Sequence, residues 1–387
     1  MTLANPTSLG IAVTGACNLN CLYCYYAEAM DARSDLSSAD WLDFFEKAGS
    51  LGVMRISMGG GEPFVRPDLF QLVDGVIANR MRYVIITNGT LINEKTIRAF
   101  DEGKRRIRLD AIQVSMDGSC PEIHNRTRPG SFGASLNGLT LLHNADLPVI
   151  VRVTINRHNL DDLDNLARLL LDRIGIAYFS TNEAMAMGAG RHTPTGLSFS
   201  ERLRAMKTMD RIRKRYPGRF RAQAGPQALL DMFSAMETAR RTGRSQGPWC
   251  TGALTACTAS FCKLDVLHDG TIVPCPMLHS IHLGNICTDA VEDIWRRHPV
   301  LKQMRSRCGI PMRRVPGCED CEWADWCNGG CPSLVYESTG DLNRSSSNTC
   351  YRRFIRKAKR MAGPFPCAVA HRQNERNAEN EKTTAQA

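Results

Sequence analysis

The chain has 387 residues, of which 43% are hydrophobic and 23% are charged, a balance that excludes a disordered or fibrous protein. Its 16 cysteines are more than average usage, and they are spread over a chain too long to be a small disulfide-stapled scaffold. The net charge is +10, and residues 351–387 contribute +6 of it through nine Lys and Arg against three Asp and Glu. The body of the chain is therefore only mildly basic.

The N-terminal residues lack the basic segment, the apolar run and the small-residue cleavage site of a secretory signal. No uninterrupted apolar stretch approaches the roughly 18 residues that a membrane-spanning helix needs. We therefore expect a cytoplasmic protein that does not associate with membranes. In a reducing compartment, clustered cysteines are more often metal ligands or catalytic groups than disulfides.

Apolar runs of strand length alternate six times with runs of helical periodicity over the first 216 residues. This order predicts an α/β fold in which helices wrap a parallel sheet, either open or closed into a barrel. The chemistry of such sheets lies at the carboxyl ends of the strands. The predicted strands are 9–13, 55–58, 83–87, 111–116, 148–155 and 177–180, and the predicted helices are 38–51, 68–79, 93–100, 134–145, 160–174 and 198–216.

The composition changes near residue 239, where ARRTGRSQGP is typical of a linker and most of the remaining cysteines follow. We expect a first domain over 1–238, a linker over 239–248, a cysteine-rich domain over 249–355 and a basic, polar tail over 356–387. The segment YRRFIRKAKR predicts a solvated amphipathic helix, with binding of RNA or an acidic peptide as the alternative.

The first cysteine cluster is a CxxxCxxC motif, formed by Cys17, Cys21 and Cys24 on the loop after the first predicted strand. Three thiolates can hold three irons of a [4Fe-4S] cubane, whereas a closed structural zinc site usually has four ligands. The fourth iron is then open to a molecule that offers nitrogen and oxygen. A zinc site completed from elsewhere and three unrelated thiols are the alternatives.

Three further motifs follow successive strands: GGGEP after the second, TNGT after the third and SMDG after the fourth. Together with the cysteine triplet they resemble the radical S-adenosylmethionine (SAM) superfamily over about residues 9–216. The resemblance implies a partial (β/α)6 TIM-like barrel and a cluster on Cys17, Cys21 and Cys24 that binds SAM. It also implies reductive cleavage of SAM to methionine and a 5′-deoxyadenosyl radical, which removes a hydrogen atom from the substrate.

The resemblance also implies a set of SAM-binding residues, although it assigns no catalytic side chain. Glycines permit close backbone approach to a ligand, and a glutamate accepts hydrogen bonds from an ammonium. The alternatives are a tight turn in GGGEP and turn or capping roles for the other polar residues. The expected set is Tyr23 near the adenine, Gly60, Gly61 and Glu62 at the amino group, Ser115 and Asp117 at the ribose, Arg152 at the carboxylate, and Asn88 lining the same cavity.

The second cysteine region is CxxCxxxxxCxxxC followed by Cys350 and preceded by a GxxxxC unit of Gly270 and Cys275. Over about 249–353 it resembles the SPASM domain, an extension of some radical SAM enzymes that binds up to two auxiliary [4Fe-4S] clusters. A pair of structural zinc sites is the alternative. The resemblance implies one cluster on Cys257, Cys262, Cys275 and Cys331, with Cys250 competing for a place, and another on Cys318, Cys321, Cys327 and Cys350.

The remaining cysteines and the histidines near Cys275 fall outside these patterns. We expect Cys120, Cys287, Cys308 and Cys367 to be incidental thiols, unless one of them donates a hydrogen atom to a substrate radical. We expect His268, His279 and His282 at the surface or beside a cluster, and not as ligands.

Enzymes that combine these two domains mostly modify peptides or proteins. We therefore expect a radical oxidoreductase that abstracts hydrogen from a ribosomally made precursor peptide or protein and installs a crosslink or a related modification. Pro276 stands where the sulfatase-maturing branch has an Asp, which argues against that branch. A porphyrin or another small cofactor precursor is the alternative substrate, and a non-catalytic metal-binding or electron-transfer protein is the more distant one.

The expected partners follow from the same interpretation. The first predicted strand begins almost at the N-terminus and no recognition domain precedes it, so we expect either a separate peptide-recognition protein or direct capture of the peptide by the mouth of the barrel. A reductant such as flavodoxin or ferredoxin would supply the electron, and nucleic acid is not expected.

Overall fold

The structure is a computed structural model that describes residues 4–222, 224–247, 250–255, 257 and 259–360. The chain forms two compact units. The first consists of Met1–Gly225 with Cys257–Arg305, and the second of Pro226–Ala256 with Ser306–Ala387. Cys367 and most of the expected tail lie outside the described residues.

The first unit is built on a ten-stranded sheet in the order β10-β9-β8-β1-β2-β3-β4-β5-β6-β7. Neighbouring strands from β1 to β7 pair in parallel, which confirms the predicted α/β fold and all six predicted strands. The strands are β1 (Ser8–Thr14), β2 (Arg55–Gly60), β3 (Arg82–Thr87), β4 (Leu109–Ser115), β5 (Val149–Ile155), β6 (Phe179–Glu183) and β7 (Phe220–Ala222).

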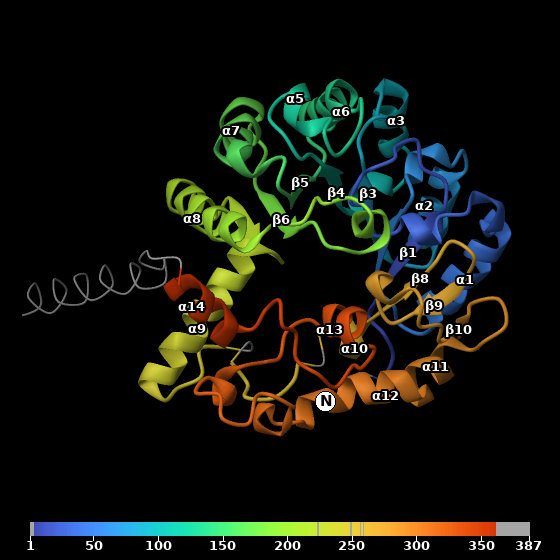
Figure 1. The fold of residues 1–387 in the computed structure, drawn as a ribbon. Coiled ribbons are helices and arrows are strands. Elements are labelled where there is room, and N and C mark those ends of the chain that lie inside the picture. Colours follow the sequence, from blue (N-terminus) through green and yellow to red (C-terminus); the bar gives the residue numbers. More distant parts are fainter. Residues whose placement is uncertain (1–3, 223, 248–249, 256, 258, 361–387) are drawn as a thin grey trace, which may run out of the picture. The chain divides into compact units, whose positions relative to one another are not determined.

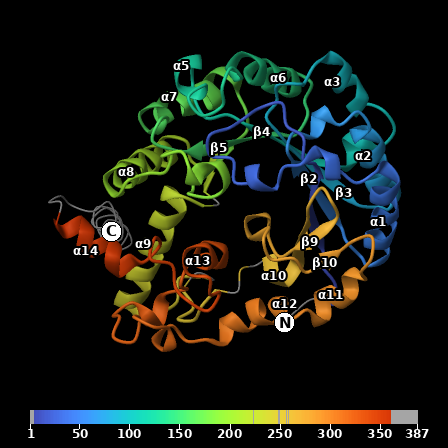
Figure 2. The same cartoon turned by 45° about the vertical axis from the view of Figure 1, so that its right-hand side comes forward.

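Helices connect these strands and lie along the outer side of the sheet (Figure 1, Figure 2). The predicted helices 38–51 and 198–216 both begin at a capping box, formed by Ser37 with Asp40 and by Ser198 with Glu201. None of the described helices is long and apolar enough to cross a bilayer. The helices are α1 (Ser38–Ser50), α2 (Leu69–Ala78), α3 (Glu94–Phe100), α4 (Arg105–Arg108), α5 (Pro121–His124), α6 (Phe132–Asn144), α7 (Leu163–Arg168) and α8 (Phe199–Arg215).

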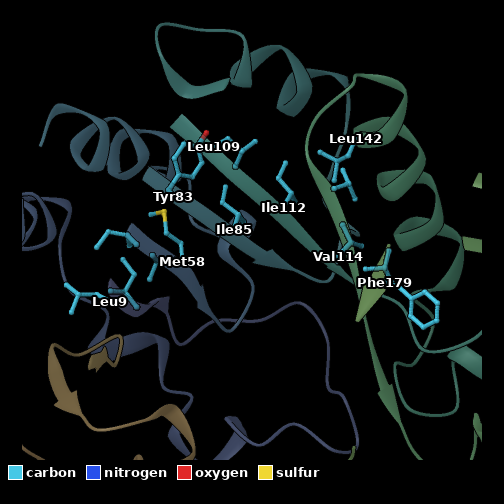
Figure 3. Close-up of a cluster of buried hydrophobic side chains, with 14 of the residues drawn as sticks. Leu9, Met58, Tyr83, Ile85, Leu109, Ile112, Val114, Leu142 and Phe179 are labelled. Carbon is cyan, nitrogen blue, oxygen red and sulfur yellow. The ribbon is translucent and has the colours of Figure 1, made fainter. Parts of the chain in front are cut away.

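The hydrophobic core lies between the sheet and its helices. Alternate residues of each strand point into it, as Leu9 does from β1 and as Ile112 and Val114 do from β4 (Figure 3). Full burial of one such side chain contributes roughly 1.5–3 kcal/mol. The residues that alternate with these core residues along each strand, such as Gly10 and Ser115, lie on the other face of the sheet. The polar residues at the strand ends are on that face too.

The segment 257–305 continues the first unit and does not begin a separate one. β8 (Lys263–Val266) pairs in parallel with β1, with Ser8 opposite Lys263 and Ile11 opposite Val266. Leu264 and Val266 join the same core, and this burial is the physical reason for the pairing. The unit is completed by α10 (Ala259–Cys262), β9 (Thr271–Val273), β10 (Gly284–Asn285), α11 (Val291–Arg297) and most of α12 (Pro299–Ser306). The expected second domain from residue 249 is thus divided between the two units.

The second unit contains α9 (Pro226–Thr242), α13 (Pro332–Thr339) and α14 (Tyr351–Arg360). Helix α9 runs four residues into the expected linker, because its apolar face is buried, with Ala239 at 0% exposure. The ring of Phe233 in α9 stacks on Tyr351 at 4.7 Å and lies 4.9 Å from Phe354, measured between centroids. The segment YRRFIRKAKR is helical as expected, and its aromatic side is buried while most of its cations are exposed.

Candidate active site at the carboxyl ends of the strands

The three cysteines of the CxxxCxxC motif lie on the loop after β1, half-buried and without disulfides. The loop begins where the Gly15 N–H donates to the Asp35 carboxylate over 2.7 Å. Farther along, the Leu22 N–H donates to the Thr127 carbonyl over 3.0 Å, and the Cys24 N–H donates to the Cys21 carbonyl over 3.1 Å. The three thiols are therefore held at the carboxyl end of the first strand, as predicted.

Burial raises the pKa of the thiols of Cys17, Cys21 and Cys24. The pKa of Cys21 rises to about 11, and the Arg128 cation is the strongest opposing influence on it. A thiol that binds a metal is deprotonated, and the positive charge of the metal replaces the proton. The site thus provides soft ligands that need a positively charged partner.

Among the residues that the structure describes, no three His, Cys, Asp or Glu side chains converge as a single-ion site would require. In a cubane each thiolate bonds a different iron, so the three sulfurs lie farther apart than around a single ion. The donor set of three thiols on one short loop therefore fits a [4Fe-4S] cluster with one open iron.

Gly60 and Gly61 lie against the cysteine loop. A Cβ at Gly60 would stand 2.5 Å from the Thr14 carbonyl oxygen, and one at Gly61 would stand 1.9 Å from the carbonyl oxygen of Ala16. The N–H of Gly61 donates to Thr14 O over 2.9 Å. The glycines thus permit a close approach of two backbone segments, and this packing holds the loop that carries the thiols.

Glu62 is 1% exposed and joins the ends of β2 and β3. Its Oε1 accepts from Thr87 Oγ1 over 2.7 Å and from the Phe64 N–H over 3.2 Å, and its Oε2 accepts from the Asn88 N–H over 2.7 Å. Burial raises the pKa of this carboxyl group. Because a carboxylate oxygen can accept two hydrogen bonds, Oε2 retains capacity for one further donor.

Asn88 is buried and bridges the end of β3 to the cysteine loop. Its Nδ2 donates to Asn18 Oδ1 over 2.8 Å, and its Oδ1 accepts from Thr90. The structure therefore brings Asn88, Glu62 and the cysteine loop together through direct contacts.

Asp117 is fully buried, and its carboxylate is engaged by the protein. Oδ1 accepts from the Thr154 N–H over 2.7 Å, and Oδ2 accepts from Arg128 Nε over 2.7 Å. The Tyr23 hydroxyl also donates to Oδ2. Tyr23 and Asp117, which the sequence assigns to adenine and ribose, are thus in direct contact with each other.

Arg128 is a site residue that sequence reasoning missed. Its NH1 donates to Cys21 Sγ over 3.7 Å, and its guanidinium carbon lies 5.4 Å from the centre of the Tyr23 ring. In HNRTRPG, which follows SMDG, nothing in the local pattern distinguishes Arg128 from the exposed Arg126. The sequence therefore carries no signal that could have singled out Arg128.

Ser115 and Arg152 are register partners on β4 and β5, and both are half-buried. Arg152 donates to Gln113 Oε1 through Nε over 3.3 Å and through NH2 over 3.0 Å. Their neighbours Val114 and Val151 point into the core, so Ser115 and Arg152 lie on the opposite face of the sheet.

His268 is 3% exposed and lies beside the cysteine loop, not at the surface. Its Nδ1 is 2.7 Å from the hydroxyl of Tyr26, and its Nε2 is 3.1 Å from Ser34 Oγ. The hairpin of β8 and β9 thereby supports the segment that follows Cys24.

The auxiliary cysteines fall in both units. In the second unit, Cys318, Cys321 and Cys327 pack against the buried cluster around Leu254. Burial raises the pKa of Cys327 to about 12, and the nearby thiols of Cys350, Cys318 and Cys321 add to this effect. These four cysteines are therefore electrostatic neighbours, as the second predicted ligand set requires.

The other predicted ligand set is divided between the units. Cys257, Cys262 and Cys275 are half-buried in the first unit, whereas Cys331 belongs to the second. Cys250, the alternative to Cys262, is buried in the second unit.

Comparison with known families agrees with this site. The sequence model of the radical SAM superfamily matches residues 11–212, which is more than half of the chain, and the chain belongs to this superfamily. A second model, the iron-sulfur cluster-binding domain SPASM, matches residues 257–322. The protein is therefore a radical SAM enzyme of the SPASM-containing kind, with SAM and iron-sulfur clusters as its cofactors.

Several curated proteins match most of the chain. The AdoMet-dependent heme synthase of Methanosarcina barkeri is 25% identical over 358 residues, which cover 90% of this chain and 97% of the relative. The mycofactocin maturase MftC of Mycobacterium ulcerans is 28% identical over 347 residues, which cover 86% of this chain and 84% of the relative. The PqqA peptide cyclase of Granulibacter bethesdensis is 25% identical, with 88% and 86% covered.

Solved structures show the same fold. SuiB of Streptococcus suis bound to its precursor peptide SuiA matches with a TM-score of 0.69 and 18% identity, over 90% of this chain and 76% of that one. The enzyme anSMEcpe with bound AdoMet matches with a TM-score of 0.66 and 17% identity, over 92% of this chain and 100% of that one.

Proposed function

We propose that this enzyme abstracts a hydrogen atom from a ribosomally made precursor peptide or protein and installs a crosslink or a related modification. The observation that supports it most is the loop of Cys17, Cys21 and Cys24, which packs against Gly60 and Gly61. The chain that carries this loop matches a mycofactocin maturase and a PqqA peptide cyclase over most of its length. The loop provides the radical chemistry, and the relatives indicate the class of substrate.

The side chains around the loop have separate roles in this proposal. When bound, SAM and the cluster supply a 5′-deoxyadenosyl radical. Glu62 Oε2, which has capacity for one more donor, would accept from the SAM amino group. Ser115 offers a hydroxyl and Arg152 a cation on the face of the sheet opposite the core, where they would bind the SAM ribose and carboxylate.

The auxiliary cysteines would hold two further [4Fe-4S] clusters. Cys318, Cys321, Cys327 and Cys350 form one set, and Cys257, Cys262, Cys275 and Cys331 form the other, with Cys250 as the alternative to Cys262. When a substrate radical forms its new bond, one electron and one proton must leave. An auxiliary cluster would accept that electron, and solvent or a nearby base would take the proton.

The proposal includes two protein partners and a location. A flavodoxin or ferredoxin in the cytoplasm would deliver the electron that starts each turnover. A separate recognition protein would present the precursor peptide.

The test uses reconstituted enzyme under anaerobic conditions with SAM, dithionite and peptides that cover the short open reading frames flanking the gene. Mass spectrometry should show a peptide that has lost two hydrogens, because one crosslink removes two. The same peptides incubated without SAM should be unchanged. If no peptide changes mass in water or takes up deuterium in D2O, as an inverted stereocentre would, while 5′-deoxyadenosine accumulates, the substrate class is wrong.

A second candidate substrate is a porphyrin, because the heme synthase relative is covered over 97% of its length. A porphyrin panel in the same assay separates the two candidates. SAM-dependent change of a porphyrin and not of any peptide would replace the peptide proposal.

A further inference from the structure

Arg128 is a buried cation that touches the cluster loop at two points. Its side chain is 10% exposed. NH1 donates to Cys21 Sγ over 3.7 Å, and the guanidinium carbon lies 5.4 Å from the centre of the Tyr23 ring. A cation so placed contacts both a cluster ligand and the residue next to another ligand.

The position of Arg128 is fixed by Asp117. Arg128 Nε donates to Asp117 Oδ2 over 2.7 Å, while NH1 is left for the sulfur of Cys21. Asp117 is itself held by the Thr154 N–H on Oδ1 and by Asn159 Nδ2, which donates to the Asp117 carbonyl over 2.9 Å. Because the guanidinium is planar, a bond at Nε also fixes the direction in which NH1 points.

The backbone around Arg128 is held as firmly as its side chain. The Arg128 N–H donates to the carbonyl of His124 over 3.1 Å, and the Arg128 carbonyl accepts from Ser131 Oγ over 2.8 Å. The preceding residue, Thr127, accepts the N–H of Leu22 from the cysteine loop. The segment therefore moves with the loop and keeps the cation beside Cys21.

A fixed cation at this place has an electrostatic consequence. Reduction adds one negative charge to an iron-sulfur cluster, and hydrogen bonds to its sulfurs help to set the potential at which this occurs. Charges interact more strongly in a buried site than in water. A cation that donates to a ligand sulfur therefore stabilises the reduced state more than the oxidised state.

We propose that Arg128 is a positioning residue that orients Cys21 and Tyr23 and raises the reduction potential of the SAM-binding cluster, with Asp117 as its anchor. The carboxylate of Asp117 then acts on SAM through Tyr23 and Arg128, since its hydrogen bonds go to the protein. This role is independent of the substrate and holds for a peptide or a porphyrin.

The test is a reductive titration of the reconstituted holoenzyme, followed by electron paramagnetic resonance, in wild type and in Arg128→Gln, Arg128→Lys and Asp117→Asn. The SAM-binding cluster is identified by the change of its spectrum when SAM is added. We expect Arg128→Gln to lower its reduction equilibrium constant at least tenfold, which is about 59 mV for one electron. Arg128→Lys keeps the charge and should recover a large part of this shift, and Asp117→Asn should reduce SAM binding and shift the potential less.

Arg126→Gln is the matched control, because Arg126 lies two residues before Arg128 in the chain and is exposed. Its Nε donates to the carbonyl of Glu122. It should leave the potential unchanged. An unchanged potential in Arg128→Gln with a full complement of iron would overturn the proposal. Loss of the cluster in both Arg128→Gln and Arg128→Lys would also overturn it, because it would show a purely structural role.

Discussion

Glu62 at the end of β2 accepts the backbone N–H of Asn88 at the end of β3 over 2.7 Å. This bond joins two strand ends beside the cysteine loop, since Glu62 also follows the glycines that pack on that loop. One side chain thus connects the sheet, the loop and the expected position of the SAM amino group.

The first prediction concerns this carboxylate. In Glu62→Gln one oxygen becomes an NH2 group, which cannot accept from the Asn88 N–H or from the Thr87 hydroxyl. Leaving a buried donor unsatisfied costs about 1–3 kcal/mol, so we expect a lower unfolding free energy and at least tenfold weaker SAM binding. Equilibrium dialysis of SAM and urea denaturation measure the two effects. Glu94→Gln, at an exposed pair with Arg98, should change neither by a comparable amount.

The second prediction concerns Gly61. A Cβ in Gly61→Ala would stand 1.9 Å from the Ala16 carbonyl oxygen, so the backbone of the cysteine loop must shift. We expect the SAM-binding cluster to be lost and 5′-deoxyadenosine formation to fall at least a hundredfold. Iron analysis and chromatography measure these quantities. Gly133→Ala, where a Cβ meets open space on helix α6, is the control and should keep full iron and activity.

The third prediction concerns pH and His124. Burial lowers the pKa of His124 to about 4, from an ordinary value near 6.5. A neutral buried histidine contributes stability that is fully present above the unfolded pKa and is lost as the pH falls toward the folded pKa. Between pH 7.5 and 5.5 the expected loss is about 1.3 kcal/mol.

Urea denaturation at the two pH values, compared between wild type and His124→Gln, measures this contribution. The variant is expected to lose that pH dependence, and the exposed His192→Gln is expected to keep it. Equal pH dependence in wild type and His124→Gln would contradict the assignment.

The fourth prediction concerns the second unit. Phe233 is fully buried, stacks on Tyr351 and packs against Phe354, so Phe233→Ala should destabilise this unit by about 3–5 kcal/mol. Limited proteolysis should then cut near α14 first. Ser234→Ala, on the same helix and half-buried, should leave the cleavage pattern unchanged.

Local patterns predicted the first six strands and the cysteine loop, because each of these features can be recognised from a few consecutive residues. The local patterns missed β8, because the segment KLDV forms a strand only by pairing with β1, which lies about 255 residues away in the chain. They also assigned residues 239–242 to a linker, because the sequence ARRT is polar, whereas the structure buries Ala239 in helix α9. In both cases contacts with distant parts of the chain determine the secondary structure.

In the candidate site, too, local sequence predicted some features and missed those that depend on long-range contacts. The glycines of GGGEP were predicted to admit a ligand, which stays a prediction, and the structure shows in addition that they admit the backbone of the cysteine loop. Arg128 could not be identified, because its role depends on where Asp117 and Cys21 meet in space. Residue type predicted the chemistry, whereas tertiary contacts determined which residues support it.

The most direct test of the central claim compares wild type with the variant in which Cys17, Cys21 and Cys24 are all replaced by Ala. Both are reconstituted anaerobically, analysed for iron and sulfide, and supplied with SAM and dithionite. Wild type should contain about twelve irons in three clusters of four and should form 5′-deoxyadenosine. The triple variant should keep about eight irons and form none. Formation of 5′-deoxyadenosine by the triple variant, or zinc in place of iron in an inactive wild type, would contradict the account.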